Sequence, residues 1–470
     1  MCYFTFFITK YNGLFLRINL LTLIFFFIFS HLNAQILKVS NNKRHLVNED
    51  GRPFFYLGDT AWELFHRLNR EEASEYLINR AEKGFNVIQA VVLAELDGLN
   101  TPNAYGHIPL KDNDPAQPEE AYFEHVDFIV NKAEELEIFI GMLPNWGDKF
   151  NPDWGGGPEI FTPENAKKYG EFLGKRYANK PIIWILGGDR IPSTDSQKAI
   201  VRAMAEGIKK GDKGKNLMTY HPMGENSSSQ FFQEESWLDF NMFQSGHGKL
   251  NAPNYQMTIN DLKLNPLKPT LDGEPRYEDH PVNWKPELGR FDAYDVRQAA
   301  YWSVLAGAMG HTYGNHNIWQ MWQPERTPIS FARTPWKDAM DQPGAYQVGY
   351  LRNLLESRPF GKLVPEQSII MGHPGSEMEH ARAALAEDGS FSIIYLPTGK
   401  SVNLKMSKIG KSKVKAWWFD PRTGTAEIIG EYVNLGVREF DPPGEPGRDN
   451  DWVLILEDAS KNFPVPGYFN

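Results

Sequence analysis

The sequence predicts an α/β chain, a (β/α)8 barrel of the TIM type followed by a C-terminal β-sandwich. Two observations lead to this prediction. Between residues 54 and 313, short apolar runs alternate with segments of helical spacing, as in parallel strands joined by helices. From about Gly361 onward, strand-like runs follow one another closely with turn pairs and no helices between them, which is typical of a sandwich.

Residues 1–34 have the layout of a secretory signal peptide. Lys10 and Arg17 precede the apolar segment Leu20–Ser30, and Ala34 stands at the expected cleavage point. The apolar segment is short for a membrane span, so cleavage is favoured over the alternative, an uncleaved N-terminal anchor. We therefore expect a periplasmic or secreted protein that has no membrane partner once the signal is removed.

Cysteine content and charge exclude several classes of function. The only cysteine, Cys2, lies in the predicted signal, so the mature protein has no disulfide, thiol nucleophile or cysteine-based metal site. A formal net charge of −10 argues against nucleic acid or an anionic membrane as partner. The 13 Trp residues offer flat apolar faces that suit sugar rings, although most aromatic residues in a chain of this size belong to the core.

The predicted barrel occupies residues 35–360 and begins after a short hairpin in residues 37–53. Helix signals, such as Thr162 as a cap with Pro163 in the first turn, separate the predicted strands. The predicted strands are 54–57, 85–93, 138–143, the apolar part of 181–190, 217–220, 240–244, 270–272 and the residues around 312. The predicted helices include 70–83, 118–136, 162–177, 196–210 and 293–309.

The predicted sandwich occupies residues 361–470. Turn pairs such as Asp388-Gly389 and Thr423-Gly424 separate its apolar runs, and no helical segment lies between them. The runs are 381–385, 391–396, 402–404, 414–419, 426–429 and 453–456. We expect this region to pack on the barrel more than to act as an independent ligand module.

The stretch Pro181–Arg190 carries the first candidate catalytic residue. Its apolar run, mostly β-branched or aromatic, fits a strand buried on both faces. Gly187 and Gly188 then let the backbone leave the strand sharply and present Asp189 at the carboxyl end, where barrel enzymes gather their chemistry. A cap for the next helix is the alternative role for a single strand-end Asp.

A second strand end, in residues 269–278, repeats this design with Gly273 followed by Glu274. Asp189 and Glu274 are 85 residues apart, and a βα unit takes about 30 residues, so about three strands separate the two acids. In a closed eight-stranded ring they would face each other across one mouth. Two facing carboxyl groups are what cleavage of a glycosidic bond requires: one protonates the leaving oxygen, and the other attacks the anomeric carbon or activates water.

Further polar and aromatic residues at the predicted strand ends are candidates for substrate contact. Asp59 is favoured among them because it lies close to Trp62, a candidate stacking platform. Each could instead be a helix cap, a structural ion pair or a buried structural polar group. The candidates are Asp59, Trp62, Gln89, Asn145, Trp146, Arg190, His221, Gln244, His247, Arg276, His311 and His316.

Other catalytic chemistries find little support in the sequence. His311 and His316 are five residues apart and no H-E-x-x-H pattern occurs, so we expect no catalytic zinc and no cofactor. A Ser-His-Asp esterase is disfavoured because the chain has no G-x-S-x-G motif.

Several long motifs resemble one family, the apiosidase-like barrels of glycoside hydrolase family 140, which carry a C-terminal domain labelled as collagen-binding. The resemblance covers about residues 37–458. The motifs are YLGDTAWELFHRL at 56–68, GFNVIQ at 84–89, WILGGDR at 184–190, DGEPRYE at 272–278 and AWWFDPRTG at 416–424. The resemblance implies an exported hydrolase that acts on plant pectin side chains at apiose, with the acid/base at Asp189 and the nucleophile at Glu274.

The residue before Asp189 marks a departure from related barrels. Retaining barrel glycosidases of the large clan usually carry Asn-Glu at this strand end, whereas this chain has Gly188-Asp189. The shorter acid widens the gap between the pair, and since retention needs about 5–5.5 Å and inversion about 6.5–9.5 Å, both outcomes stay open. The main hypothesis is therefore a glycoside hydrolase with a carbohydrate substrate, and the alternative is an inactive carbohydrate- or matrix-binding protein.

Overall fold

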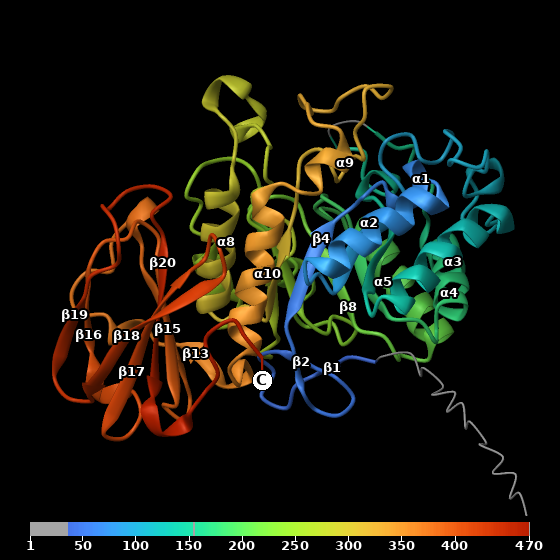
Figure 1. The fold of residues 1–470 in the computed structure, drawn as a ribbon. Helices are drawn as coiled ribbons and strands as arrows, with labels where there is room; N and C mark the ends of the chain where they lie inside the picture. The colour runs from blue at the N-terminus through green and yellow to red at the C-terminus, as the bar shows by residue number, and fades with distance from the viewer. Residues whose placement is uncertain (1–35, 154–155, 470) are drawn as a thin grey trace, which may run out of the picture. The chain divides into compact units, whose positions relative to one another are not determined.

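Eight parallel strands form the centre of the barrel region in the computed structural model, which describes residues 36–153 and 156–469 (Figure 1). Every residue of these strands is buried, as parallel strands covered on both faces require. The strands are β4 (Tyr56–Thr60), β5 (Val87–Leu93), β6 (Phe139–Asn145), β7 (Ile182–Gly187), β8 (Met218–His221), β10 (Asn241–Gln244), β11 (Thr270–Asp272) and β12 (Gly310–Tyr313).

The ring of strands is nearly closed. The pairing order is β8-β7-β6-β5-β4-β12-β11-β10, with the short β9 (Asn226–Ser227) added antiparallel to β10. Between β8 and β10, which do not pair directly, the N–H of Asp239 donates to the carbonyl of Met218 at 2.8 Å. The hydroxyl of Thr219 donates to the carbonyl of Phe240 at 2.7 Å. The predicted barrel-type α/β fold is thus confirmed.

Helices cover the outside of the barrel, and several of them begin at side-chain caps. Asn69, Thr162, Thr194 and Asp292 each form a capping box at the start of a helix, which satisfies backbone N–H groups that have no helical partner. The helices are α1 (Leu64–Arg67), α2 (Arg70–Glu82), α3 (Glu120–Glu135), α4 (Pro163–Arg176), α5 (Asp195–Asp212), α6 (Ser229–Phe232), α7 (Asn254–Asp261), α8 (Ala293–Leu305), α9 (Trp336–Ala339) and α10 (Pro343–Glu356).

A small antiparallel sheet precedes the barrel, where the sequence predicts a hairpin. It consists of β1 (Lys38–Val39), β2 (Leu46–Val47) and β3 (Pro53–Phe54). Its residues Leu46 and Phe54, with Leu37 just before β1, join the apolar cluster that fills the barrel interior. The predicted signal peptide lies outside the described residues. Within the ranges that the structure describes, no helix has both the length and the apolar character that crossing a membrane demands.

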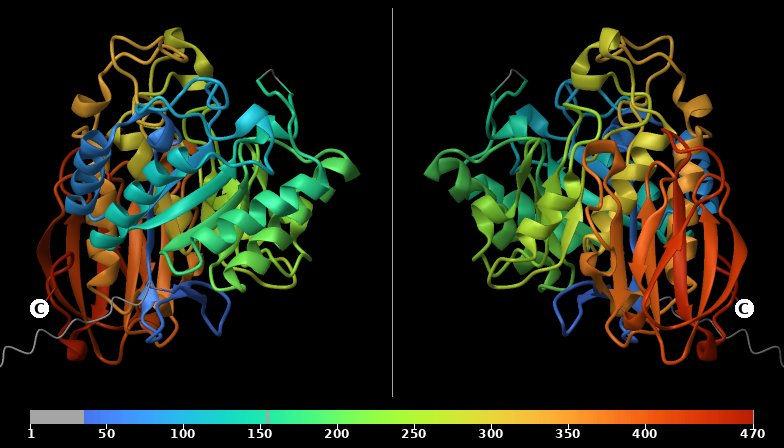
Figure 2. Two further views of the ribbon diagram at one scale, coloured as in Figure 1. Left: turned by 90° about the vertical axis from the view of Figure 1, so that its right-hand side faces the viewer. Right: turned by 90° about the vertical axis from the view of Figure 1, so that its left-hand side faces the viewer.

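The C-terminal region is an antiparallel β domain in which the central strands of one sheet are buried on both faces. Along β15, Ile393 and Tyr395 pack against α8 and α10, while Ile394 and Leu396 face the small second sheet. This alternation follows from the two-residue period of a strand. The large sheet has the order β13 (Leu363–Pro365), β14 (Arg382–Ala386), β15 (Phe391–Leu396), β20 (Trp452–Asp458), β17 (Lys413–Asp420) and β18 (Thr425–Val433), and the small one pairs β16 (Val402–Lys405) with β19 (Val437–Phe440). Figure 2 shows the strands beside the helices.

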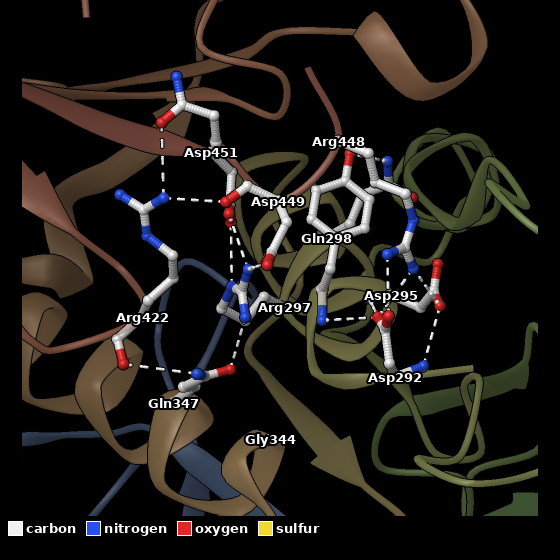
Figure 3. A network of polar contacts seen from close by, with 12 residues as sticks. Asp292, Asp295, Arg297, Gln298, Gly344, Gln347, Arg422, Arg448, Asp449 and Asp451 are labelled. Carbon is white, nitrogen blue, oxygen red and sulfur yellow. Dashed lines mark hydrogen bonds and ion pairs between the residues drawn. The ribbon is translucent and has the colours of Figure 1, made fainter. Parts of the chain in front are cut away.

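Buried ion pairs join the β domain to the barrel (Figure 3). Arg297 of α8 donates to both carboxylate oxygens of Asp451, at 3.0 and 2.8 Å, and to Asp449 at 2.7 Å. The side chains of Arg297 and Asp451 are 2% and 0% exposed. Arg448 in turn donates to Asp292 at the start of α8, at 2.8 Å. The two regions therefore form one compact unit.

Two features of the chain differ from the sequence-based expectation. Strand β4 continues to Thr60, so Asp59 lies inside the strand and not at its end. The helix α10 was not predicted, although Pro343 at its first turn is a common start signal. It occupies the space between barrel and β domain, and its apolar residues belong to the same cluster as the inner face of the large sheet.

Replacing Arg297 by methionine tests how much the contact between the barrel and the β domain depends on the ion pair of Arg297 with Asp451. The change leaves the carboxylate of Asp451 buried without its cation, so we expect the free energy of unfolding to fall by about 3–5 kcal/mol. Urea unfolding followed by tryptophan fluorescence measures this loss. Lys168→Met, which breaks an exposed ion pair with Glu164 on α4, is the matched control with an expected change below about 0.5 kcal/mol. Equal effects of both variants would contradict the assignment.

Candidate active site

The first candidate carboxylate, Asp189, lies on a turn that follows β7. Gly187, Gly188 and Asp189 have positive φ angles of 88°, 118° and 53°. A Cβ on Gly188 would lie 2.8 Å from the Trp146 ring and 2.9 Å from the nitrogen of Gly147, so only glycine fits there. The turn brings Asp189 to the wall of a pocket at the barrel mouth, where its side chain is 30% exposed.

The second candidate carboxylate, Glu274, follows β11 and lines the same pocket. Its side chain is 9% exposed, and one imidazole lies at each of its oxygens. His247 Nε2 hydrogen-bonds to Oε1 at 3.1 Å, and His221 Nε2 lies 3.0 Å from Oε2. The backbone N–H of Gly246 also donates to the Glu274 carbonyl at 3.0 Å, which fixes the position of the main chain.

His221, at the end of β8, connects the two carboxylates. The backbone N–H of Asp189 donates to His221 Nδ1 at 3.3 Å. This bond leaves the proton of the neutral ring on Nε2, the nitrogen that faces Glu274. Trp62 and Trp146 pack on the imidazole with ring centroids 5.5 and 6.0 Å away. The ring orientation is thus held by packing and by hydrogen bonding together.

The surroundings separate the pKa values of the two acids. Burial, and then the negative charge of Glu274, raise the pKa of Asp189 to about 7, against smaller opposing effects of His221 and Arg190. Burial also acts to raise the pKa of Glu274, but the hydrogen bonds from His221 and His247 outweigh it and place that pKa below its usual range. Below about pH 7, therefore, Asp189 carries the proton and Glu274 the charge.

The pocket that both carboxyl groups line has a volume of about 610 Å³, within the usual range for small-molecule sites. Of the sequence candidates for substrate contact, Trp62, Trp146, Gln244 and His247 line it. Both tryptophans are only 3% exposed, so they form the floor of the pocket.

Four more sequence candidates lie outside the pocket lining and contact residues that belong to it. His221 contacts Glu274, and Arg190 donates to the carbonyl of Asp189 at 2.8 Å. Asn145 donates to the carbonyl of Trp146 at 2.7 Å. His316 hydrogen-bonds to the carbonyl of Ser330 at 2.8 Å. The geometry gives these four residues supporting positions around the site.

The remaining four candidates are placed away from the pocket lining, in structural contacts that correct the expectation of substrate contact. Asp59 faces the helix layer, where it pairs with Arg80 of α2 at 2.6 Å. Gln89 lies within β5 and donates to the carbonyl of Gly273 at 3.1 Å. His311 bonds to Ser303 of α8 at 3.0 Å, and Arg276 donates to Gln298 of α8 at 3.1 Å. Asp59 and His311 thus face the helix layer, whereas the side chain of Gln89 lies inside the barrel, where it also donates to the hydroxyl of Thr312 at 3.0 Å.

Sequence reasoning missed Glu95, a third acid in the pocket wall. It stands two residues beyond the end of β5, so its position after a strand was the available signal. Burial, followed by the charges of Asp189 and Asp148, raises the pKa of Glu95 to about 8. At neutral pH it is protonated and can donate a hydrogen bond into the pocket.

Sequence reasoning also missed the loop that follows Glu274, although it directly adjoins the motif DGEPRYE. This loop supplies Tyr277, His280, Asn283 and Trp284 to the pocket. In the part of the chain that the structure describes, no three His, Cys, Asp or Glu side chains gather as ligands for a metal ion.

A comparison with family models matches residues 40–362 to the description "Apiosidase-like, catalytic domain". The chain belongs to the apiosidase-like family and is a glycoside hydrolase. A second model, described as "Putative collagen-binding domain of a collagenase", matches residues 364–457. No curated protein matches the chain. Family membership confirms the resemblance that the sequence motifs carry, and it implies a carbohydrate substrate.

Solved structures support the same assignment. One described as a glycoside hydrolase is 36% identical, with a TM-score of 0.84, and the match covers 91% of this chain and 98% of that one. A glycoside hydrolase family 5 structure from Bacteroides vulgatus is 35% identical, with a TM-score of 0.86 and coverage of 92% and 95%. A third, from the same organism, is 17% identical with a TM-score of 0.65, covers 90% and 82%, and shows the fold alone.

Replacing His247 by phenylalanine tests how the imidazoles act on Glu274. The loss of one hydrogen bond to a charged carboxylate, worth about 1.5–3 kcal/mol, raises the pKa of Glu274 by about one to two units. We expect the acidic limb of the kcat/KM profile against pH to move upward by that amount. His107→Phe, a change at an exposed residue far along the chain, is the control and leaves the limb in place. An unmoved limb in the His247 variant would refute the assigned effect.

Proposed function

We propose that the protein is an exported glycoside hydrolase that cleaves plant pectin side chains at apiose linkages. Asp189 serves as the general acid/base, and Glu274 as the nucleophile or as the base that activates water. The observation that carries the proposal is the pair of carboxyl groups in one pocket, with a proton favoured on Asp189 and a charge on Glu274. Apiose as the sugar and pectin as the source rest on membership of the apiosidase-like family.

The chemical step uses the difference between the two acids. Protonated Asp189 gives its proton to the leaving glycosidic oxygen as the bond to the anomeric carbon breaks. Charged Glu274 attacks that carbon, or removes a proton from the water that does so. In the first case Asp189, now ionised, takes a proton from the water that releases the sugar. Proton NMR of the first product anomer distinguishes the two routes.

The β domain supports the barrel in this proposal. Its family description refers to collagen, but one face of its large sheet packs on α8 and α10 and the other on the small sheet. The central strands of this sheet are therefore occupied on both faces by contacts within the chain, and the substrate-binding role is assigned to the barrel pocket.

Asp189→Asn and Glu274→Gln test the two assigned roles. Since general acid catalysis contributes about 10²- to 10⁴-fold, we expect kcat to fall by at least about 10²-fold in each variant. Release of sugar from an apiose-containing pectin fragment is the measurement. Glu287→Gln, a change in an exposed acid of the loop after Glu274, is the control and retains activity. Turnover at the wild-type rate by either active-site variant would refute the assigned catalytic roles.

The pKa of Asp189 predicts the alkaline limb of activity. Because the acid must be protonated to help the leaving group depart, kcat/KM falls as the pH rises through about 7. An activated aryl leaving group departs with little help from a proton donor, so the Asp189→Asn variant can still cleave such a substrate. We expect the pH profile of this cleavage to lack the alkaline limb near pH 7. A limb that persists in this variant would assign the titration to another group, such as Glu95.

A further inference from the structure

The loop after Glu274 exposes an aromatic side chain at the rim of the pocket. Trp284 is 49% exposed, which makes it the most exposed of the tryptophans that the structure describes. It lines the pocket together with His280 and Asn283 of the same loop. An exposed indole at the edge of a pocket has no core-packing role, so its position calls for another explanation.

The backbone of this loop is held in a conformation that side chains rarely adopt. Asn283 and Trp284 have φ angles of 51° and 58°, and Asp279 has 65°. Such angles persist where surrounding contacts enforce them. The N–H of Asn283 donates to the carbonyl of His247 at 2.8 Å, and Asp279 is ion-paired with Arg333 of the neighbouring loop. The indole is therefore held in place before any ligand binds.

Ring contacts connect Trp284 to the catalytic carboxylate. His247 and His280 are stacked with centroids 4.3 Å apart, and the indole meets both at steep angles, with centroids 6.0 and 5.6 Å away. His247 is the residue that hydrogen-bonds to Glu274. A ring that packs on Trp284 would consequently lie next to the sugar unit whose bond is cleaved.

The charge of the pocket limits which ring can bind. Four acids line it, namely Glu95, Asp189, Glu225 and Glu274, and no lysine or arginine belongs to the described lining. Glu274 holds its negative charge, so a sugar that carries a carboxylate would approach it against electrostatic repulsion, with no lysine or arginine in the described lining to offset that repulsion. An uncharged sugar presents C–H groups to the indole and hydroxyls to the acids.

We propose that Trp284, together with His280, forms a subsite that binds the apolar face of an uncharged sugar ring adjoining the scissile bond. The subsite rests on the proposed function, since it positions the substrate of the same reaction. Its role is to bind substrate and not to take part in proton transfer. Loss of the indole should therefore weaken binding and raise KM while kcat stays close to its original value.

Binding is measured in the Asp189→Asn background, so that the probe stays intact and the charge of Glu274 is kept. The probe is an apiose-containing pectin oligosaccharide, titrated calorimetrically before and after reduction of its uronic acid carboxyls to alcohols. We expect Trp284→Ala to raise Kd by about tenfold or more for the reduced, uncharged probe, and Trp284→Phe to restore most of the affinity. Leu288→Ala is the matched control, because Leu288 is 52% exposed in the same loop and lies outside the described lining.

Two results would overturn the subsite. One is an unchanged Kd in Trp284→Ala, and the other is binding of the charged probe at least tenfold tighter than of the reduced one. Turnover measurements distinguish a failure of the subsite proposal from a failure of the proposed function. If Asp189→Asn and Glu274→Gln lose activity while Trp284→Ala keeps both KM and Kd, only the subsite is wrong. If those two variants keep wild-type turnover, the catalytic assignment is wrong, and the Kd values still decide the subsite.

Discussion

The site depends on two carboxyl groups that line one pocket, where both cannot be charged at low cost. Glu274 receives a hydrogen bond from His247 and the close approach of His221, whereas Arg190 lies 3.6 Å from the carboxylate of Asp189. The charge therefore settles on Glu274 and the proton on Asp189. A pair of acids separated in this way supplies both a proton donor and an anion at neutral pH.

The fold creates this asymmetry by bringing several strand ends to one mouth. His221 comes from β8 and His247 from the segment after β10, so both histidines reach Glu274 from strands on the same side of the ring. The turn that carries Asp189 is joined to His221 through a backbone hydrogen bond. A displacement of that turn would change the orientation of the imidazole, and through it the environment of Glu274. The two acids are thus coupled mechanically as well as electrostatically.

The sequence predicts the barrel and the placement of both acids because these follow from local patterns. Apolar runs that end in glycine indicate strand ends, and carboxylates after them point to one mouth. The sequence-based prediction misplaces Asp59 because strand β4 continues to Thr60. Within a strand, a shift of one residue turns a side chain to the opposite face, so Asp59 faces the helix layer and not the barrel mouth. The partners of His221 and His247 are set by the three-dimensional arrangement of strands far apart in the chain, so no local pattern reveals them.

The β domain reaches the active site through the loop that carries Glu274. Two residues further on, the guanidinium of Arg276 lies over the ring of Trp302 in α8, 5.8 Å from its centroid. Trp302 donates to the carbonyl of His380 at 2.8 Å, at the edge of the β domain. Because α8 is also held by the buried pair of Arg297 with Asp451, two contacts with the β domain hold the helix that supports this loop. The domain thereby supports the loop that carries Glu274, although none of its described residues lines the pocket.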